Sequence, residues 1–137
     1  MGLPSFSPML ASALPPVLVV DDNPAESAVT LVNLGAVGFA AVAESEGDDV
    51  LQRARRSLTH VLVSELYVPC AEGDCVVRVL KSERARLPRL QVLIHTRHTT
   101  DLDAEWALAA GCDAFVPKGA SAAVLVREVR RLEGFAK

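Results

Sequence analysis

The chain has 137 residues, of which 50% are hydrophobic and 23% are charged. This composition is ordinary for a folded globular domain and excludes general disorder, and no apolar run approaches the roughly 20 residues of a membrane span. The formal net charge of −3 argues against a protein that binds nucleic acid through bulk positive charge.

The chain opens with a proline-rich segment. Four of its first 16 residues are proline, and the segment lacks the basic start of a signal peptide. We therefore expect a flexible N-terminal segment at 1–15, one folded domain at 16–134 and a short tail at 135–137.

Short apolar runs alternate with segments of helical periodicity from residue 17 onward. The apolar runs predict buried strands, at 17–20, 39–43, 60–65, 90–95 and 113–116. Helices are expected after each of them, at 23–35, 48–57, 74–86, 99–111 and 121–133. Asn23 as N-cap and Pro24 at the first helical position open the first helix, and Asp48 or Asp49 caps the second.

Five successive strand–helix units imply a parallel sheet with right-handed crossovers and helices on both faces. The expected fold class is therefore α/β, a flavodoxin-like doubly wound (βα)5 three-layer sandwich with the strand order 2-1-3-4-5.

Acidic residues dominate the first part of the chain. Residues 1–50 contain seven acidic residues and no Lys or Arg, whereas residues 51–137 carry all 14 basic residues. The acidic part is either a solvated surface or a cation-binding site, and its composition alone does not distinguish them.

The predicted topology brings several polar side chains to one edge of the sheet, because ligands of such sheets bind beyond the carboxyl ends of the strands. The side chains that follow the strands there are Asp21, Asp22, Glu65, Thr96 and Lys118. Converging carboxylates repel one another unless a cation compensates, and either Mg²⁺ or the Lys118 ammonium could do so. The turn after the first strand lacks glycine, which argues against a phosphate cradle of the nucleotide-binding type.

Four segments, taken together and in order, resemble the receiver domain of bacterial two-component response regulators over about residues 17–133. They read VLVVDDNP at 17–24, VLVSELYVP at 61–69 followed by Gly73, VLIHT at 92–96 and GCDAFVPK at 111–118. In that family a histidine kinase phosphorylates an aspartate at the end of the third strand, with Mg²⁺ in the site.

The resemblance implies a role for each matching position. The positions are the metal ligands Asp21, Asp22, Glu65 and the backbone carbonyl of Tyr67, the phosphoryl contacts Thr96 and Lys118, and the aromatic switch Phe115.

Two positions depart from the family pattern. The acceptor position, four residues before Pro69, is Glu65 rather than aspartate. Its extra methylene displaces the carboxylate by about one C–C bond, roughly 1.5 Å, and phosphoryl transfer depends on positioning. The second departure is Gly119, which replaces the proline that follows the lysine in the family and loosens the local backbone.

We therefore expect a degenerate receiver that signals by protein contacts without phosphorylation, and that is not an enzyme. Glu65 would partly imitate a phosphorylated aspartate by reaching Thr96 or Lys118, and Mg²⁺ would bind weakly at most. The alternatives are a conventional receiver still phosphorylated by a histidine kinase, and a Mg²⁺-dependent phosphoryl-transfer enzyme on the same fold.

The expected partners are proteins, either a histidine kinase or an output protein, with no direct contact to nucleic acid or membrane. In the family, the face formed here by 99–111, 113–116 and 121–133 mediates dimers, so a homodimer through it is one expectation. Trp106 on this face is either a core residue or an exposed anchor. The three cysteines show neither even pairing nor zinc-ligand spacing, which favours a reducing, cytoplasmic compartment.

Overall fold

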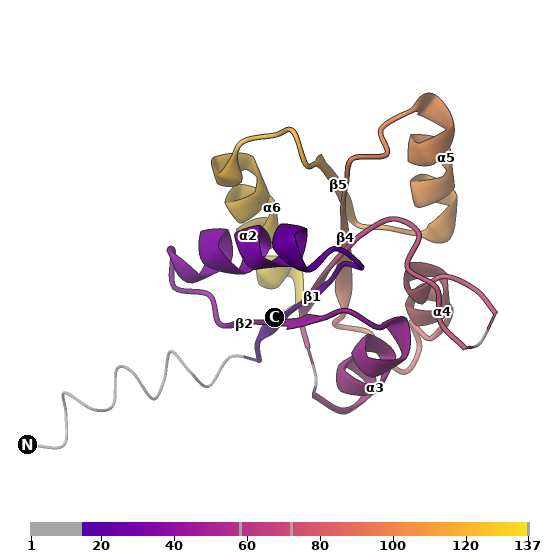
Figure 1. The fold of residues 1–137 in the computed structure, drawn as a ribbon. Coiled ribbons are helices and arrows are strands. Elements are labelled where there is room, and N and C mark those ends of the chain that lie inside the picture. Colours follow the sequence, from indigo (N-terminus) through magenta and orange to yellow (C-terminus); the bar gives the residue numbers. More distant parts are fainter. Residues whose placement is uncertain (1–14, 58, 72, 137) are drawn as a thin grey trace, which may run out of the picture.

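The computed structural model describes residues 15–57, 59–71 and 73–136. Within them a single parallel sheet has the order β2-β1-β3-β4-β5, so the predicted fold class and strand order are confirmed (Figure 1). The strands are β1 Val17–Val20, β2 Ala41–Glu44, β3 Val61–Ser64, β4 Gln91–Thr96 and β5 Ala114–Pro117. Apart from Pro15, the segment expected to be flexible lies outside the described residues.

Helices cover both faces of the sheet. They are α2 Pro24–Gly35, α3 Gly47–Ser57, α4 Val76–Ser82, α5 Asp101–Ala110 and α6 Ala122–Ala136. Helices α2 and α6 pack on one face, and α3, α4 and α5 pack on the other (Figure 1). No helix within the described part of the chain is both long enough and apolar enough to cross a membrane.

The two layers follow from the alternation of side chains along each strand. Val17 and Val19 of β1 pack in the core beneath α2 and α6, whereas Leu18 and Val20 pack in the core beneath α3, α4 and α5. Since both sets are apolar, the strand is buried on both faces. This arrangement leaves the carboxyl ends of the strands as the place where polar side chains can gather.

Several element boundaries differ from the prediction. Helix α4 is shorter at both ends than the predicted 74–86, because the chain first forms an antiparallel bridge between Pro69 and Cys75, and after Ser82 it turns ahead of Pro88. Strand β2 begins two residues later than predicted, since its register pairs Ala41 with the first residue of β1.

Two helices also start or end differently. Helix α3 begins at Gly47, so Asp48 and Asp49 lie in its first turn rather than at its cap, where the helix dipole favours negative charge. Helix α6 continues to Ala136, into the segment that we assigned to a tail. Its last turns are anchored by buried Leu132 and by Glu133, whose carboxylate contacts buried His60 just before β3.

Candidate functional site

The carboxyl ends of neighbouring strands hold the predicted site residues side by side. The backbone N–H of Glu65, just after β3, donates to the carbonyl of Val20 in β1 at 2.9 Å. The N–H of Lys118, just after β5, donates to the carbonyl of Thr96 in β4 at 2.9 Å. The sheet hydrogen bonding thus extends one residue beyond each strand and fixes where these side chains begin.

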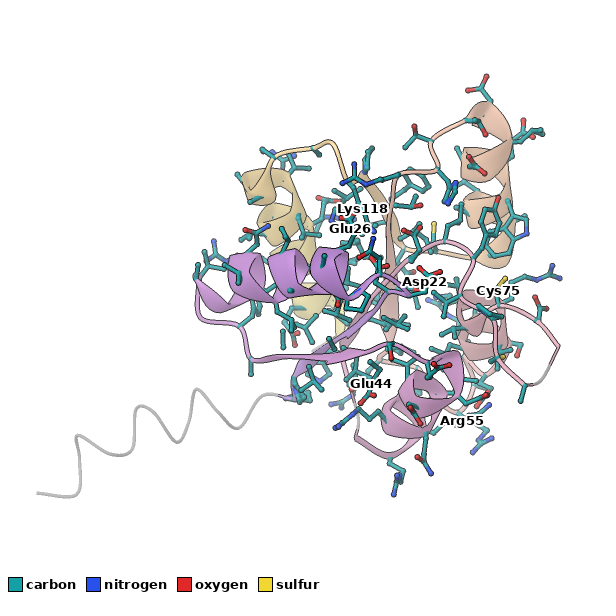
Figure 2. All side chains as sticks on the ribbon, viewed as in Figure 1. Asp22, Glu26, Glu44, Arg55, Cys75 and Lys118 are labelled. Carbon is teal, nitrogen blue, oxygen red and sulfur yellow. The ribbon has the colours of Figure 1, made fainter. Side chains whose placement is uncertain are left out.

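Lys118 is the centre of the site. Its side chain is only 5% exposed, and its Nζ lies 2.5 Å from Oδ2 of Asp21 and 3.0 Å from Oε2 of Glu65. A third carboxylate, that of Glu26, lies 3.8 Å away. Figure 2 shows Lys118 and Glu26 close together at the start of α2. One buried ammonium therefore compensates carboxylates that follow β1 and β3 and one in α2.

The two nearest carboxylates are also held by the backbone. Oδ1 of Asp21 accepts the N–H of Asn23 at 2.9 Å, and Asn23 in turn caps α2. Oε1 of Glu65 accepts the N–H of Leu66 at 2.7 Å. Each carboxylate therefore uses one oxygen for a local turn and the other for Lys118, which is the pattern that stabilises buried charge.

These contacts shift the ionisation of the pair. Burial alone would raise the pKa of Glu65, but hydrogen bonds from the Thr96 hydroxyl, the Leu66 N–H and the Lys118 ammonium outweigh burial and lower it below its usual value. Burial alone would lower the pKa of Lys118, yet its hydrogen bonds to Asp21 and Glu65 raise it. Both groups are therefore charged at neutral pH.

Thr96 lies fully buried at the floor of the site. Its hydroxyl contributes to the lowered pKa of Glu65, and its Oγ1 accepts the N–H of His98 at 3.0 Å. Glu65 thus reaches both the hydroxyl and the ammonium that the family resemblance assigns to phosphoryl contacts.

Two residues of the site were not predicted from the sequence. Arg97 is 2.6 Å from Oε1 of Glu26, and this pair lies beside Lys118 at the opening of the site. The hydrogen bond from Arg97 lowers the pKa of Glu26. A sequence signal did exist: Glu26 is an acid in the first turn of the helix after Asp21, and Arg97 directly follows Thr96.

Other predicted site residues stand apart from the Lys118 cluster. Asp22 is exposed, and within the described ranges its carboxylate makes no hydrogen bond or ion pair. The Tyr67 ring turns towards α5, where its hydroxyl donates to Asp103 at 2.7 Å and its ring meets Trp106 edge-on at 5.1 Å. Phe115 is half-buried against the core beneath α5, as is Trp106.

The carboxylates do not form a ready metal site in this arrangement. Lys118 takes one oxygen from each of Asp21 and Glu65, and backbone N–H groups take the others. Among the residues that the structure describes, no group of three or more His, Cys, Asp or Glu side chains is placed to hold a metal ion. In this arrangement the Lys118 ammonium supplies the charge that compensates Asp21 and Glu65.

The arrangement as a whole places a fixed negative group where an acceptor would stand. Glu65 is ionised, hydrogen-bonded and close to both a hydroxyl and an ammonium. An attack of this carboxylate on phosphorus would change its contact with Lys118.

Known proteins resemble this chain in sequence. The family described as "Response regulator receiver domain" matches residues 17–130. The transcriptional activator protein ExaE of Pseudomonas putida is 32% identical over 124 residues, which cover 85% of this chain and 54% of that protein. The probable transcriptional regulatory protein TcrX of Mycobacterium tuberculosis is 32% identical over 116 residues, which cover 85% and 48%. The chain thus spans about half the length of these curated relatives.

Solved structures share the fold. The receiver domain of the Francisella response regulator 1452 superposes with a TM-score of 0.77 at 20% identity, over 90% of this chain and 99% of that one. The receiver domain of the sensor histidine kinase PA1611 from Pseudomonas aeruginosa, described with a magnesium ion in its active site cleft, has a TM-score of 0.75 at 23% identity over 88% and 98%. Because the family match covers most of the chain, this protein belongs to the response regulator receiver domain family.

Proposed function

We propose that this receiver domain works in two-component signalling without being phosphorylated, with Glu65 as a permanent occupant of the acceptor position. The contact of Glu65 with Lys118 at 3.0 Å is the observation that carries the proposal. A conventional acceptor must be free to attack, whereas Glu65 is already tied to the groups that would receive the phosphoryl oxygens.

Glu65 imitates a phosphorylated aspartate only in part. Its carboxylate brings one negative charge and two oxygens, whereas an aspartyl phosphate brings about −1.5 to −2 and three acceptor oxygens. Since both Thr96 and Lys118 are reached, the protein sits in one signalling state, which is set by its sequence rather than by a kinase.

The contacts of Lys118 disfavour Mg²⁺ binding at this site. The ion would have to displace the Lys118 ammonium from Asp21 and Glu65 before it could bind their oxygens. We therefore propose weak Mg²⁺ binding at most, without a role in holding the signalling state.

Receiver domains act through protein contacts, with histidine kinases on one side and output regions on the other. For this chain we propose an output protein that docks on α5 near Tyr67, where Leu102 and Leu108 are exposed. Tyr67 joins α5 to the loop after Glu65 through its bond to Asp103, so the acceptor position and this face are mechanically connected.

The proposal predicts that the wild-type protein stays unmodified after incubation with acetyl phosphate and Mg²⁺. In a productive reaction, a carboxylate oxygen would attack phosphorus, the bond to acetate would break, and acetate would leave. Intact-mass spectrometry checks for the added phosphoryl group, and a mass increase that maps to Glu65 would show a conventional receiver instead. Steady hydrolysis of p-nitrophenyl phosphate would show the enzyme alternative.

A further inference from the structure

The outer surface of α2 is apolar although it faces solvent. Its exposed residues include Ala25, Ala28, Val29 and Val32, and Ala36 follows at its end. The spacings of three and four residues place them on one side of the helix. Val29 is 59% exposed and Val32 is 69% exposed, and the helix carries no basic residue. We call these five residues the α2 stripe.

The carboxyl end of the stripe opens onto a groove between α2 and α6. The groove encloses about 480 Å³ and is lined mainly by apolar atoms, from Ala36 and Val37 on one side and Ala122 and Val126 on the other. Arg127 and Arg130 of α6 also line it. Within the described residues, neither arginine makes a hydrogen bond or an ion pair, so this end of the stripe carries positive charge, which Glu128 compensates in part at Arg127.

The amino end of the stripe carries the opposite charge. Asp22 lies just before α2, exposed and without an ion-pair partner among the described residues. Beside it, the carboxylates of Asp21, Glu26 and Glu65 outnumber the two cations that they contact, Lys118 and Arg97. The two ends of one apolar stripe are thus negative and positive.

We propose that the α2 stripe is a self-association surface that binds a second copy of this chain, with the two α2 helices antiparallel across a two-fold axis. A two-fold interface pairs the same patch with itself, so the amino end of one α2 meets the carboxyl end of the other. Asp22 then faces Arg127 and Arg130 of the second copy, and Val29 and Val32 lie near the axis. The charge pattern along the stripe is complementary to itself only in this orientation.

The dimensions suit a weak dimer. Twelve helical residues extend over about 18 Å, and the alanines let two helices approach closely while the valines supply the apolar area. Since the patch is small and the charges at its ends lie in solvent, we expect a dimer that forms at high concentration and weakens with salt.

The face of α5, β5 and α6, which the family resemblance suggested for a dimer, is less suited to pair with itself. Its acid Asp103 already accepts the Tyr67 hydroxyl, and Arg131 is already paired with Glu128 at 2.9 Å. These two charges are therefore used within one molecule, whereas Arg127 and Arg130 of the same helix line the groove beside α2. The α2 surface goes beyond the proposed function and is independent of whether Glu65 accepts a phosphoryl group.

Sedimentation equilibrium over a range of protein concentrations tests the proposal. The wild type should show a monomer–dimer equilibrium, and Val32→Glu should be monomeric throughout, because two carboxylates would meet at the axis. Leu102→Glu on α5 is the matched control, since Leu102 is also highly exposed, and it should dimerise like the wild type. Circular dichroism confirms that both variants fold.

A charge exchange tests the orientation. Asp22→Lys and the double variant Arg127→Asp/Arg130→Asp should each dimerise less than the wild type, whereas an equimolar mixture of the two should recover association. A wild type that is monomeric at every concentration, a dimer that survives Val32→Glu, or one that Leu102→Glu abolishes would each overturn the proposal. A mixture that fails to recover association would overturn the antiparallel arrangement.

Discussion

Shortening Glu65 to aspartate is expected to turn the domain into a phosphorylatable receiver. Glu65→Asp withdraws the carboxylate by about one C–C bond, roughly 1.5 Å, and weakens its hold on Lys118, which now lies 3.0 Å from Oε2. Misplacement of about 1 Å costs on the order of 100-fold in rate. We therefore expect a gain of about that size in phosphoryl incorporation from acetyl phosphate with Mg²⁺, measured by intact mass over time.

Two control variants test whether the gain in phosphorylation requires an aspartate at position 65. Glu128→Asp makes the same change in an exposed ion pair and should stay unmodified, as should Glu65→Gln, because a carboxamide forms no acyl phosphate. If Glu65→Asp remains inert while its fold and melting temperature are those of the wild type, the extra methylene is not what prevents phosphorylation.

Replacing Lys118 is expected to have the largest effect on stability. Lys118→Met removes the ammonium and leaves Asp21 and Glu65 buried with no cation in contact. Breaking a buried ion pair by removing one partner costs about 3–5 kcal/mol. The freed oxygens should now attract a divalent ion, so Mg²⁺ should restore part of the loss in the variant and change the wild type little.

Urea unfolding with and without Mg²⁺ measures both effects. Arg78→Met is the control, because its ion pair with Asp74 at 3.4 Å is largely exposed and such pairs contribute less than about 1 kcal/mol. A Lys118→Met variant as stable as the wild type, or Mg²⁺ stabilising both proteins equally, would show that Lys118 is not the cation that the site depends on.

Much of the fold followed from local sequence patterns. The β-branched run at Val17–Val20 predicted a strand buried on both faces, and Asn23 followed by Pro24 predicted the start of α2 at the residue where it begins. The end of α4 was harder to place, because the helical pattern continues beyond Ser82 while the turn ahead of Pro88 depends on tertiary packing.

The sequence predicted those features of the site that depend only on the order of the strands. Parallel strands in a known order place Asp21, Glu65, Thr96 and Lys118 at one edge whatever their rotamers. The remaining features depend on side-chain direction, which strand order does not determine. The pairing of Glu26 with Arg97 is one example, because nothing in either segment alone specifies the contact across 71 residues.

The shifted pKa values of Glu65 and Lys118 determine the pH range over which their ion pair stabilises the folded domain. The pKa of Glu65 is lowered in the fold, so its contribution is complete above its unfolded value of about 4.3 and is lost as pH falls through the folded value. The pKa of Lys118 is raised, so its contribution is complete below about 10.4 and is lost as pH rises through the folded value. The ion pair therefore stabilises the domain across the whole neutral range.

In our proposal Lys118, and not a metal ion, holds Glu65 ionised in the acceptor position. The most direct measurement is a pH titration of the Glu65 side-chain carboxyl by ¹³C NMR, with and without Mg²⁺. We predict a midpoint below about 4.3 that Mg²⁺ leaves unchanged and that Lys118→Met moves upward. A midpoint at or above the ordinary value, or one that Mg²⁺ shifts strongly in the wild type, would contradict the account.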